Sequence, residues 1–347
     1  MAARHAILAL LLSASAPAAA GTFTQTNLVS DGSIPAAVTD PNLKNPWGIS
    51  YPPTGPFWVS DNNSGLSTLY SGTGAIVPLV VTIPAAASGT GMGSPTGQLF
   101  NPSKDFVISA GGKTGPASFI FVTEDGTISG WNSSVNANTA VVAVDRSSKG
   151  AVYKGVAMYT DSAGDNFLLA TDFHGGKVDV FDGKFNLVAE FRDHGLPTIY
   201  SPYNVAVLNG NIFVTYARVN AKRHNSVSGP GLGGIEEVTF SGHVLVRVLH
   251  GPLNAPWGLA VAPSSFGTHA GDILVGNFGS GNIAAYTPAL APRGLLKSTS
   301  GGPVTINGLW GLIDGNGGSG GNASTLYFTA GPNNEANGLL GALNYMP

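Results

Sequence analysis

Short apolar runs that end in a small or polar residue recur along the chain. They are 57–61 (FWVSD), 120–124 (IFVTE), 168–172 (LLATD), 212–216 (IFVTY), 273–277 (ILVGN) and 326–330 (LYFTA). Each run is continuously apolar rather than alternating, which indicates a strand buried on both faces. Turn residues follow each run, and further short apolar segments come next. No segment combines a helical period with capping residues, so the pattern predicts an all-β protein.

A second motif precedes each of these runs. It consists of a turn residue, a bulky residue, Gly or Asn, and then an apolar residue in most copies. The copies are 46–49 (PWGI), 95–98 (PTGQ), 153–156 (YKGV), 202–205 (PYNV), 256–259 (PWGL) and 309–312 (LWGL), separated by 49, 58, 49, 54 and 53 residues. A four-stranded β-propeller blade takes about 40–50 residues. Six copies therefore predict a six-bladed β-propeller, with the motif on the innermost strand of each blade.

The sixth repeat is one strand short at its C-terminal end. The remaining strand-like segment is Thr22 to Val29, near the N-terminus. We predict that it completes the last blade, because closing the ring leaves no sheet edge exposed. The motif glycines should stand where innermost strands converge and a Cβ would collide with the next blade. The prediction is one propeller domain over residues 21–347.

Residues 1–20 have the features of a signal peptide. A basic start at Arg4 precedes a short apolar run, and 18–20 (AAA) gives a small-x-small cleavage site. The apolar run is too short for a membrane anchor. We therefore expect cleavage near Ala20 and a secreted or periplasmic protein with no membrane span.

Composition narrows the chemistry. The chain has 49 Gly, no Cys, 10% charged residues and a net charge of −3. Without cysteine, thiolate nucleophiles and Cys-ligated metals are excluded. The net charge argues against nucleic-acid binding, which needs a concentrated basic surface.

Several segments carry a family resemblance. Segments 45–48 (NPWG), 121–131 (FVTEDGTISGW) and 255–258 (APWG) are similar to an uncharacterised family of exported bacterial six-bladed propeller proteins. Segment 172–182 (DFHGGKVDVFD) resembles an NHL repeat, within the NHL-repeat and gluconolactonase-like (TolB-like) superfamily. In gluconolactonase-like proteins a metal near the channel serves lactone hydrolysis. The resemblance implies the location of a site here, and not its ligands.

The innermost strands begin, and the second strands end, on one face of a propeller, here called the rim. Oxygen-bearing side chains should gather there and could bind Ca²⁺, which takes six to eight oxygen ligands, or another divalent cation. The candidate ligands are Asp61, Glu124, Asp172, Asn204 and Asn277. Alternatively, each acid bonds to backbone N–H groups of its own hairpin, as Asp and Asn commonly do.

Large side chains should surround the same channel mouth and serve either packing or ligand contact. They are Trp47, Lys154, Tyr203, Tyr216, Arg218, Trp257 and Trp310. Lys154 stands where three other blades have Trp, and it could lie over an aromatic face. A loop after Arg218 holds the one basic cluster, which could cover the channel mouth and attract an anion, or be a solvated flap.

Three function classes remain. The first is a scaffold that binds a small molecule or a protein at the rim. The second is a metal-dependent hydrolase or lyase acting on a small sugar- or lactone-like substrate. The third is a purely structural surface protein. The histidines have no zinc-site spacing, although His174 is the best placed of them. No residue pattern identifies a catalytic group, so the first class is favoured, with a monomer expected.

Overall fold

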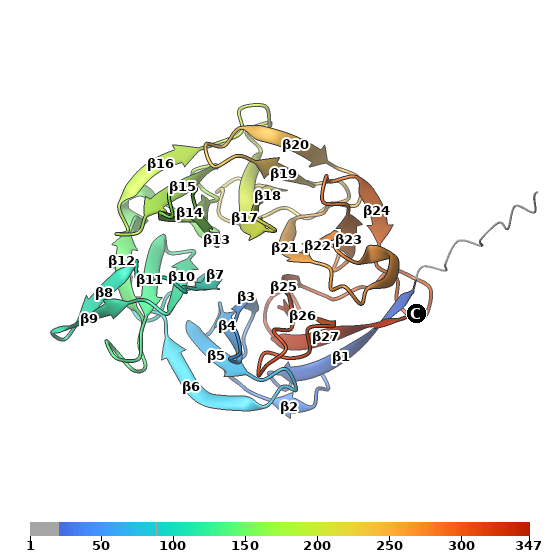
Figure 1. The fold of residues 1–347 in the computed structure, drawn as a ribbon, viewed down its shortest axis with the longest axis horizontal. Coiled ribbons are helices and arrows are strands. Elements are labelled where there is room, and N and C mark those ends of the chain that lie inside the picture. The colour runs from blue at the N-terminus through green and yellow to red at the C-terminus, as the bar shows by residue number, and fades with distance from the viewer. Residues whose placement is uncertain (1–20, 88) are drawn as a thin grey trace, which may run out of the picture.

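The computed structural model describes residues 21–87 and 89–347, and this part of the chain is all-β apart from two short 3-10 turns (η1, Ser147–Lys149; η2, Gly267–His269). Six main sheets surround a central axis, which confirms the predicted six-bladed propeller (Figure 1). The predicted signal peptide, residues 1–20, lies outside the described residues. Within the described ranges no helix is long and apolar enough to cross a membrane.

Each blade runs from an innermost to an outermost strand. The strands are, for blade 1, β3 (Pro46–Ser50), β4 (Phe57–Asp61), β5 (Leu66–Tyr70) and β6 (Ile76–Thr82); for blade 2, β7 (Pro95–Phe100), β10 (Phe119–Thr123), β11 (Thr127–Trp131) and β12 (Val141–Asp145); for blade 3, β13 (Tyr153–Thr160), β14 (Asn166–Asp172), β15 (Lys177–Asp182) and β16 (Leu187–Phe191); for blade 4, β17 (Tyr200–Leu208), β18 (Asn211–Arg218), β19 (Gly233–Val238) and β20 (Val244–Leu249); for blade 5, β21 (Pro256–Val261), β22 (Ile273–Asn277), β23 (Ile283–Tyr286) and β24 (Pro292–Leu295). A hairpin of β8 (Val107–Ala110) and β9 (Lys113–Pro116) projects from blade 2 (Figure 1).

Blade 6 joins the two ends of the chain. It consists of β25 (Leu309–Asp314), β26 (Thr325–Ala330), β27 (Leu339–Met346) and the N-terminal β1 (Thr22–Ser30), with β2 (Val38–Thr39) added outside. Strand β1 pairs antiparallel with β27 from Thr22 opposite Met346 to Ser30 opposite Leu339. The predicted closure by the N-terminal strand is confirmed.

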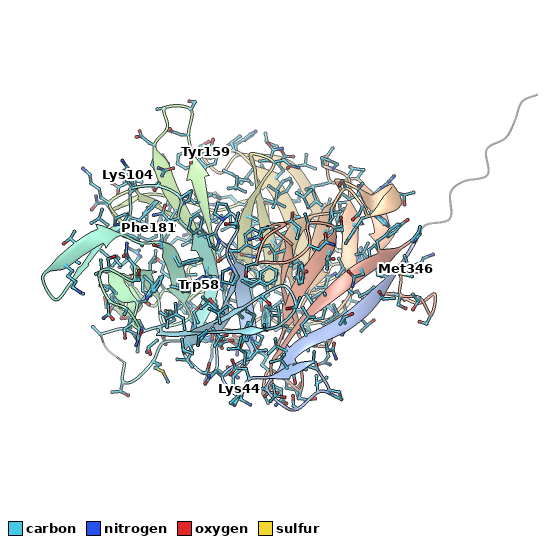
Figure 2. The ribbon with its side chains drawn as sticks, turned by 60° about the horizontal axis from the view of Figure 1, so that its bottom comes forward. Lys44, Trp58, Lys104, Tyr159, Phe181 and Met346 are labelled. Atoms are coloured by element: carbon cyan, nitrogen blue, oxygen red, sulfur yellow. The ribbon has the colours of Figure 1, made fainter. Side chains whose placement is uncertain are left out.

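Apolar packing between neighbouring blades holds the ring together. Six clusters of buried side chains each draw on two adjacent blades. Trp58, for example, stacks on Phe119 of the next blade with ring centroids 3.9 Å apart. Figure 2 shows Trp58 and Phe181 within this layer of side chains. Because both faces of a blade are covered, the second strand of each blade is mainly apolar, as the sequence runs indicate.

In five of the six blades, the motif glycine brings the innermost strand against the next blade. A Cβ on Gly48 would lie 2.5 Å from the carbonyl oxygen of Thr96, and a Cβ on Gly258 would lie 2.6 Å from that of Trp310. All six innermost strands also have a register shift at the motif. A β-bulge changes which side chain faces which side, so these shifts decide what points at the axis.

Candidate ligand site at the channel rim

Aromatic side chains close the axial channel at the rim. This aromatic cluster consists of Trp47, Phe173, Tyr203, Trp257, Phe278 and Trp310. Trp47 and Trp310 stack with centroids 3.5 Å apart, and Trp47 meets Tyr203 edge-on at 6.5 Å. Blades 1 and 4 lie on opposite sides of the ring, so their side chains can meet only at the axis. Four of the predicted rim residues are therefore brought together.

Lys154 enters this cluster from blade 3. Its side chain is 2% exposed, and its Nζ lies 5.0 Å from the ring centre of Trp47 and 5.8 Å from that of Phe173. It forms an ion pair with Glu124, whose side chain is 16% exposed. The contact with an aromatic face that the sequence analysis considered for Lys154 is thus present alongside a buried ion pair.

A hydrogen-bonded chain extends from this ion pair across the channel mouth. The amide of Asn62 donates to Glu124 Oε2 at 3.2 Å. The amide of Asn45 donates to Asn62 Oδ1 at 3.3 Å and to Glu335 Oε2 at 3.0 Å. Two carboxylates from blades 2 and 6 therefore belong to one polar network above the aromatic cluster.

The two carboxyl groups have opposite pKa shifts. Burial by itself would raise the pKa of Glu124, but the charge and hydrogen bond of Lys154 outweigh it and the net pKa is lowered. Burial raises the pKa of Glu335, and the negative charge of Glu124 adds to the rise. As pH falls, Glu335 therefore takes up a proton before Glu124 does.

Glu335 is a site residue that the sequence analysis missed. It lies in the turn between β26 and β27, where Asn333, Asn334 and Glu335 have φ values of 55°, 54° and 69°. Three consecutive non-glycine residues in the left-handed region are unusual, and such strain concentrates at functional sites. The signal available in the sequence is the single acidic residue in an otherwise Asn-, Gly- and Ala-rich turn.

The structure brings only part of the predicted oxygen set to the axis. Asp61 is fully buried and accepts from Thr68 Oγ1 at 2.7 Å. Asp172 accepts from the backbone N–H groups of Val152 at 3.1 Å and Gly175 at 2.9 Å. Burial raises the pKa of both acids. Asp172 thus caps its own hairpin, which is the alternative interpretation given above.

The two predicted amide ligands are also engaged with neighbouring backbone groups. Asn204 donates to the carbonyl oxygen of Trp257 at 2.8 Å, and Asn277 accepts from the N–H of Asn254 at 2.8 Å. In the described part of the chain, no group of three or more His, Asp or Glu side chains is placed to hold a metal ion. The divalent cation stays a prediction.

A one-residue offset explains this placement. The first motif residue of each innermost strand pairs with Asp61, Thr123, Asp172, Tyr216, Asn277 or Ala330 on the second strand. In five blades the axial side is occupied by the following residue: Asn62, Glu124, Phe173, Ala217 or Phe278. Successive strand residues point to opposite faces, so in blades 1, 3, 4 and 5 the strand-end residue lies on the other face from the axial side chain.

Tyr216 and Arg218 lie apart from the aromatic cluster. Tyr216 packs among core residues of blades 3 and 4, and its phenol lies beside buried Glu236, so the prediction that it faces the channel is wrong. The side chain of Arg218 is exposed at the end of β18.

The basic loop after β18 forms one wall of an open pocket on this face. The rim pocket, of about 610 Å³, is lined by Glu124, Asp125, His174, Lys222, His224 and Asn225, among others. Arg223 fixes the loop by donating to the carbonyl oxygens of His174 at 2.9 Å and Thr198 at 2.8 Å, and to Ser201 Oγ at 2.7 Å. The loop is therefore held in place next to Glu124, with acids on one wall and cationic or imidazole groups on the other.

Comparison with known proteins identifies relatives over most of the chain. Uncharacterized protein R648 of Acanthamoeba polyphaga mimivirus is 30% identical over 330 residues, covering 91% of this chain and 78% of the relative. The chain belongs to the same family as this viral protein. Uncharacterized protein R640 of the same virus is 34% identical over 251 residues, and the match spans only 45% of its length. No family model matches the chain. These relatives are viral, so the predicted bacterial family is not supported.

Solved structures share the six-bladed fold at low sequence identity. A glucose dehydrogenase has a TM-score of 0.55 at 14% identity, covering 92% of this chain and 99% of its own. Virginiamycin B lyase from Staphylococcus aureus has a TM-score of 0.54 at 13% identity, covering 93% and 100%. At such identities the likeness concerns the fold alone.

Proposed function

We propose that this protein binds a small hydroxyl-rich molecule, of the sugar or sugar-lactone type, in the rim pocket. The observation that carries the proposal is the buried ion pair of Lys154 and Glu124, because Glu124 also lines that pocket. Buried ion pairs contribute little net stability, because desolvation offsets their attraction. A strained turn beside the same network supports a binding role over a packing role.

The walls of the rim pocket suit hydroxyl groups, which both donate and accept hydrogen bonds. Glu124 and Asp125 supply acceptors, whereas Lys222 and Asn225 supply donors. The pocket is concave and preformed by the Arg223 contacts, which favours a small ligand over a flat protein partner.

Saturation-transfer NMR with D-glucose and D-glucono-1,5-lactone tests the proposal. We expect transfer to at least one probe with the wild type, and weaker transfer with Lys222→Ala and His224→Ala. Lys113→Ala, on the projecting hairpin, is the matched control and should behave as wild type. If the wild type shows transfer to neither probe, or if all variants show the same transfer as the wild type, the proposal is contradicted.

A second candidate function is hydrolysis or elimination on the same class of molecule. The opposite pKa shifts of Glu124 and Glu335 within one network favour it, because such pairs divide the roles of base and acid. A divalent cation could assist, with Glu124 the predicted ligand that borders the rim pocket. Lactone hydrolysis faster than the spontaneous rate, and lost in Glu335→Gln, would support this candidate. Lactone hydrolysis at the spontaneous rate with both the wild type and Glu335→Gln would contradict this candidate function.

Export is part of the proposal. Residues 1–20 carry the signal-peptide pattern described above. Expression in a bacterial host, followed by N-terminal sequencing of the extracytoplasmic fraction, should give a mature protein that begins at Gly21. Full-length protein confined to the cytoplasm would contradict it.

A further inference from the structure

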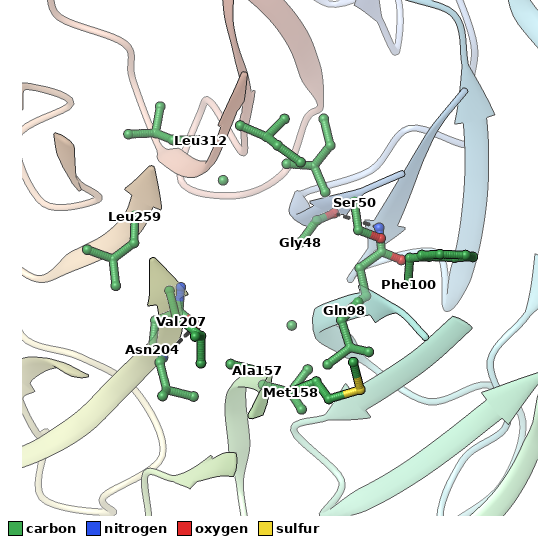
Figure 3. A pocket seen from close by; sticks show the side chains of 18 of the residues that line it. Gly48, Ser50, Gln98, Phe100, Ala157, Met158, Asn204, Val207, Leu259 and Leu312 are labelled. Carbon is green, nitrogen blue, oxygen red and sulfur yellow. Dashed lines mark hydrogen bonds between the residues drawn. The ribbon is translucent and has the colours of Figure 1, made fainter. Parts of the chain in front are cut away.

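The axial channel has a second, chemically different compartment beyond the aromatic cluster. This channel cavity, of about 420 Å³, is formed mainly by the innermost strands as they run away from the rim. Its narrow ring consists of the residues that follow the motif Gly or Asn: Ile49, Gln98, Val156, Val205, Leu259 and Leu312. Figure 3 shows Leu259, Leu312, Val207 and Met158 around an open centre.

Side-chain size distinguishes the two ends of the channel. At the rim, Trp47, Trp257 and Trp310 fill the axis completely. Two residues further along the same strands, the side chains are Ile, Leu and Leu, and space remains. Protein interiors are normally packed to crystal density, so an axial space of this size is not a packing accident.

The side chains of the narrow ring offer water few hydrogen-bond partners. Five of the six side chains that form the narrow ring of the cavity are apolar. The amide of Asn204, also on the wall, is engaged with the backbone of Trp257 and Val205. Ordered water needs two to four polar partners, so water here is easily displaced by an apolar molecule.

One wall nevertheless carries a hydrogen-bond acceptor. The amide nitrogen of Gln98 donates to the carbonyl oxygens of Gly48 and Trp58, which fixes the orientation of the amide group. Gln98 Oε1 and Ser50 Oγ have no hydrogen-bond partner among the described residues, although both residues are more than nine-tenths buried. Figure 3 shows both side chains, and that of Phe100, among the residues that line the cavity. A buried acceptor without a partner is costly, so a donor from a ligand would be favoured there.

We propose that the channel cavity binds a small apolar molecule carrying one hydrogen-bond donor, such as an aromatic alcohol. The rings occupy the space between Val205, Leu259 and Leu312, and the hydroxyl group donates to Gln98 Oε1. The volume lies in the range of small-molecule pockets. The aromatic cluster separates this site from the rim pocket, so the two sites are independent.

Isothermal titration calorimetry with 2-naphthol and 2-methoxynaphthalene tests the proposal, because the two probes share their rings and differ in the donor. We expect the wild type to bind 2-naphthol with a negative heat-capacity change, and at least about fivefold more tightly than 2-methoxynaphthalene. Gln98→Met should abolish that preference. The rim-pocket variant Lys222→Ala should leave it unchanged.

Filling the cavity supplies the decisive control. Val207→Trp, at the half-buried mouth, should weaken 2-naphthol binding at least about tenfold, with Met158→Trp as the second variant if the first does not fold. Leu245→Trp, on an exposed position of the same blade, should bind like the wild type. Folded wild type that binds neither probe, or a folded filled variant that binds as tightly as wild type, would overturn the cavity site. Equal affinity for the two probes would overturn the role of Gln98.

Discussion

Replacing Lys154 by Met should destabilise the protein strongly, in a way that depends on Glu124. The ammonium group lies among aromatic rings and is paired with Glu124, and the lysine side chain is 2% exposed. Met fills similar volume but leaves Glu124 without a counter-charge. Removing one member of a buried ion pair typically costs about 3–5 kcal/mol. Because the Glu124 side chain is 16% exposed at the rim pocket, we expect the lower end, about 3 kcal/mol.

The double variant Lys154→Met/Glu124→Gln is the matched control. It removes both charges, so it should recover most of the lost stability, and replacing a whole buried pair can even be stabilising. Urea-induced unfolding followed by tryptophan fluorescence measures all four proteins of the cycle. If Lys154→Met costs as much stability in the Glu124→Gln background as it does in the wild type, the argument is refuted.

The pH dependence gives a second check on the same pair. In the wild type the pKa of Glu124 is lowered, so its stabilising contribution is present above pH 4.5 and is lost as pH falls through the lowered pKa. Without Lys154, burial should raise that pKa above 4.5. The free-energy cost of burying ionised Glu124 without a counter-charge then grows as pH rises through the raised pKa. The destabilisation by Lys154→Met should therefore be larger at pH 8 than at pH 5, and an equal loss at both pH values would contradict the assignment.

Three further experiments test other parts of the structure. Deletion of residues 21–30 removes β1 and exposes the edge of β27, so light scattering and melting curves should show association or a lower melting temperature; an unchanged monomer would contradict this. Asp172→Asn keeps the oxygen that accepts from two backbone N–H groups, so it should change the free energy of unfolding by about 1 kcal/mol or less. Calcium should not raise the melting temperature of this variant. A calcium-induced rise in the wild type that this variant loses would support the predicted cation site. Burial raises the pKa of Glu236 from 4.5 to about 7, so its ionisation lowers stability as pH rises over that interval. Glu236→Gln should remove this decline between pH 5 and pH 8, and identical melting-temperature slopes would refute it.

The sequence was sufficient to predict the fold because the repeat is local and regular. Each blade contributes a motif with a bulky residue followed by Gly or Asn, and each motif Gly has the same reason, the close approach of the next blade. The closure by β1 followed from counting strands in the last repeat. Neither prediction required knowing where a side chain points.

The site was harder to predict because it depends on side-chain direction. Asp172 and Phe173 are successive residues, as are Asn277 and Phe278, and successive strand residues point to opposite faces. An offset of one residue therefore exchanges the side chain that joins the aromatic cluster. The sequence therefore predicted that Trp47, Tyr203, Trp257 and Trp310 gather at the rim, whereas Tyr216 packs in the core between blades 3 and 4.

Residues that depart from the repeat mark the polar features of the channel. Lys154 stands where three blades have Trp, and Gln98 stands where the others have an apolar residue. At the axial end of the second strands, Glu124 occupies the position that Phe173 and Phe278 fill with rings. If packing alone had shaped the channel, apolar residues would serve at all three positions, since burying a charge or an amide costs free energy. The polar side chains at these positions are therefore the common basis of both binding proposals: hydroxyl groups at the rim beside Glu124, and a single donor in the cavity beside Gln98.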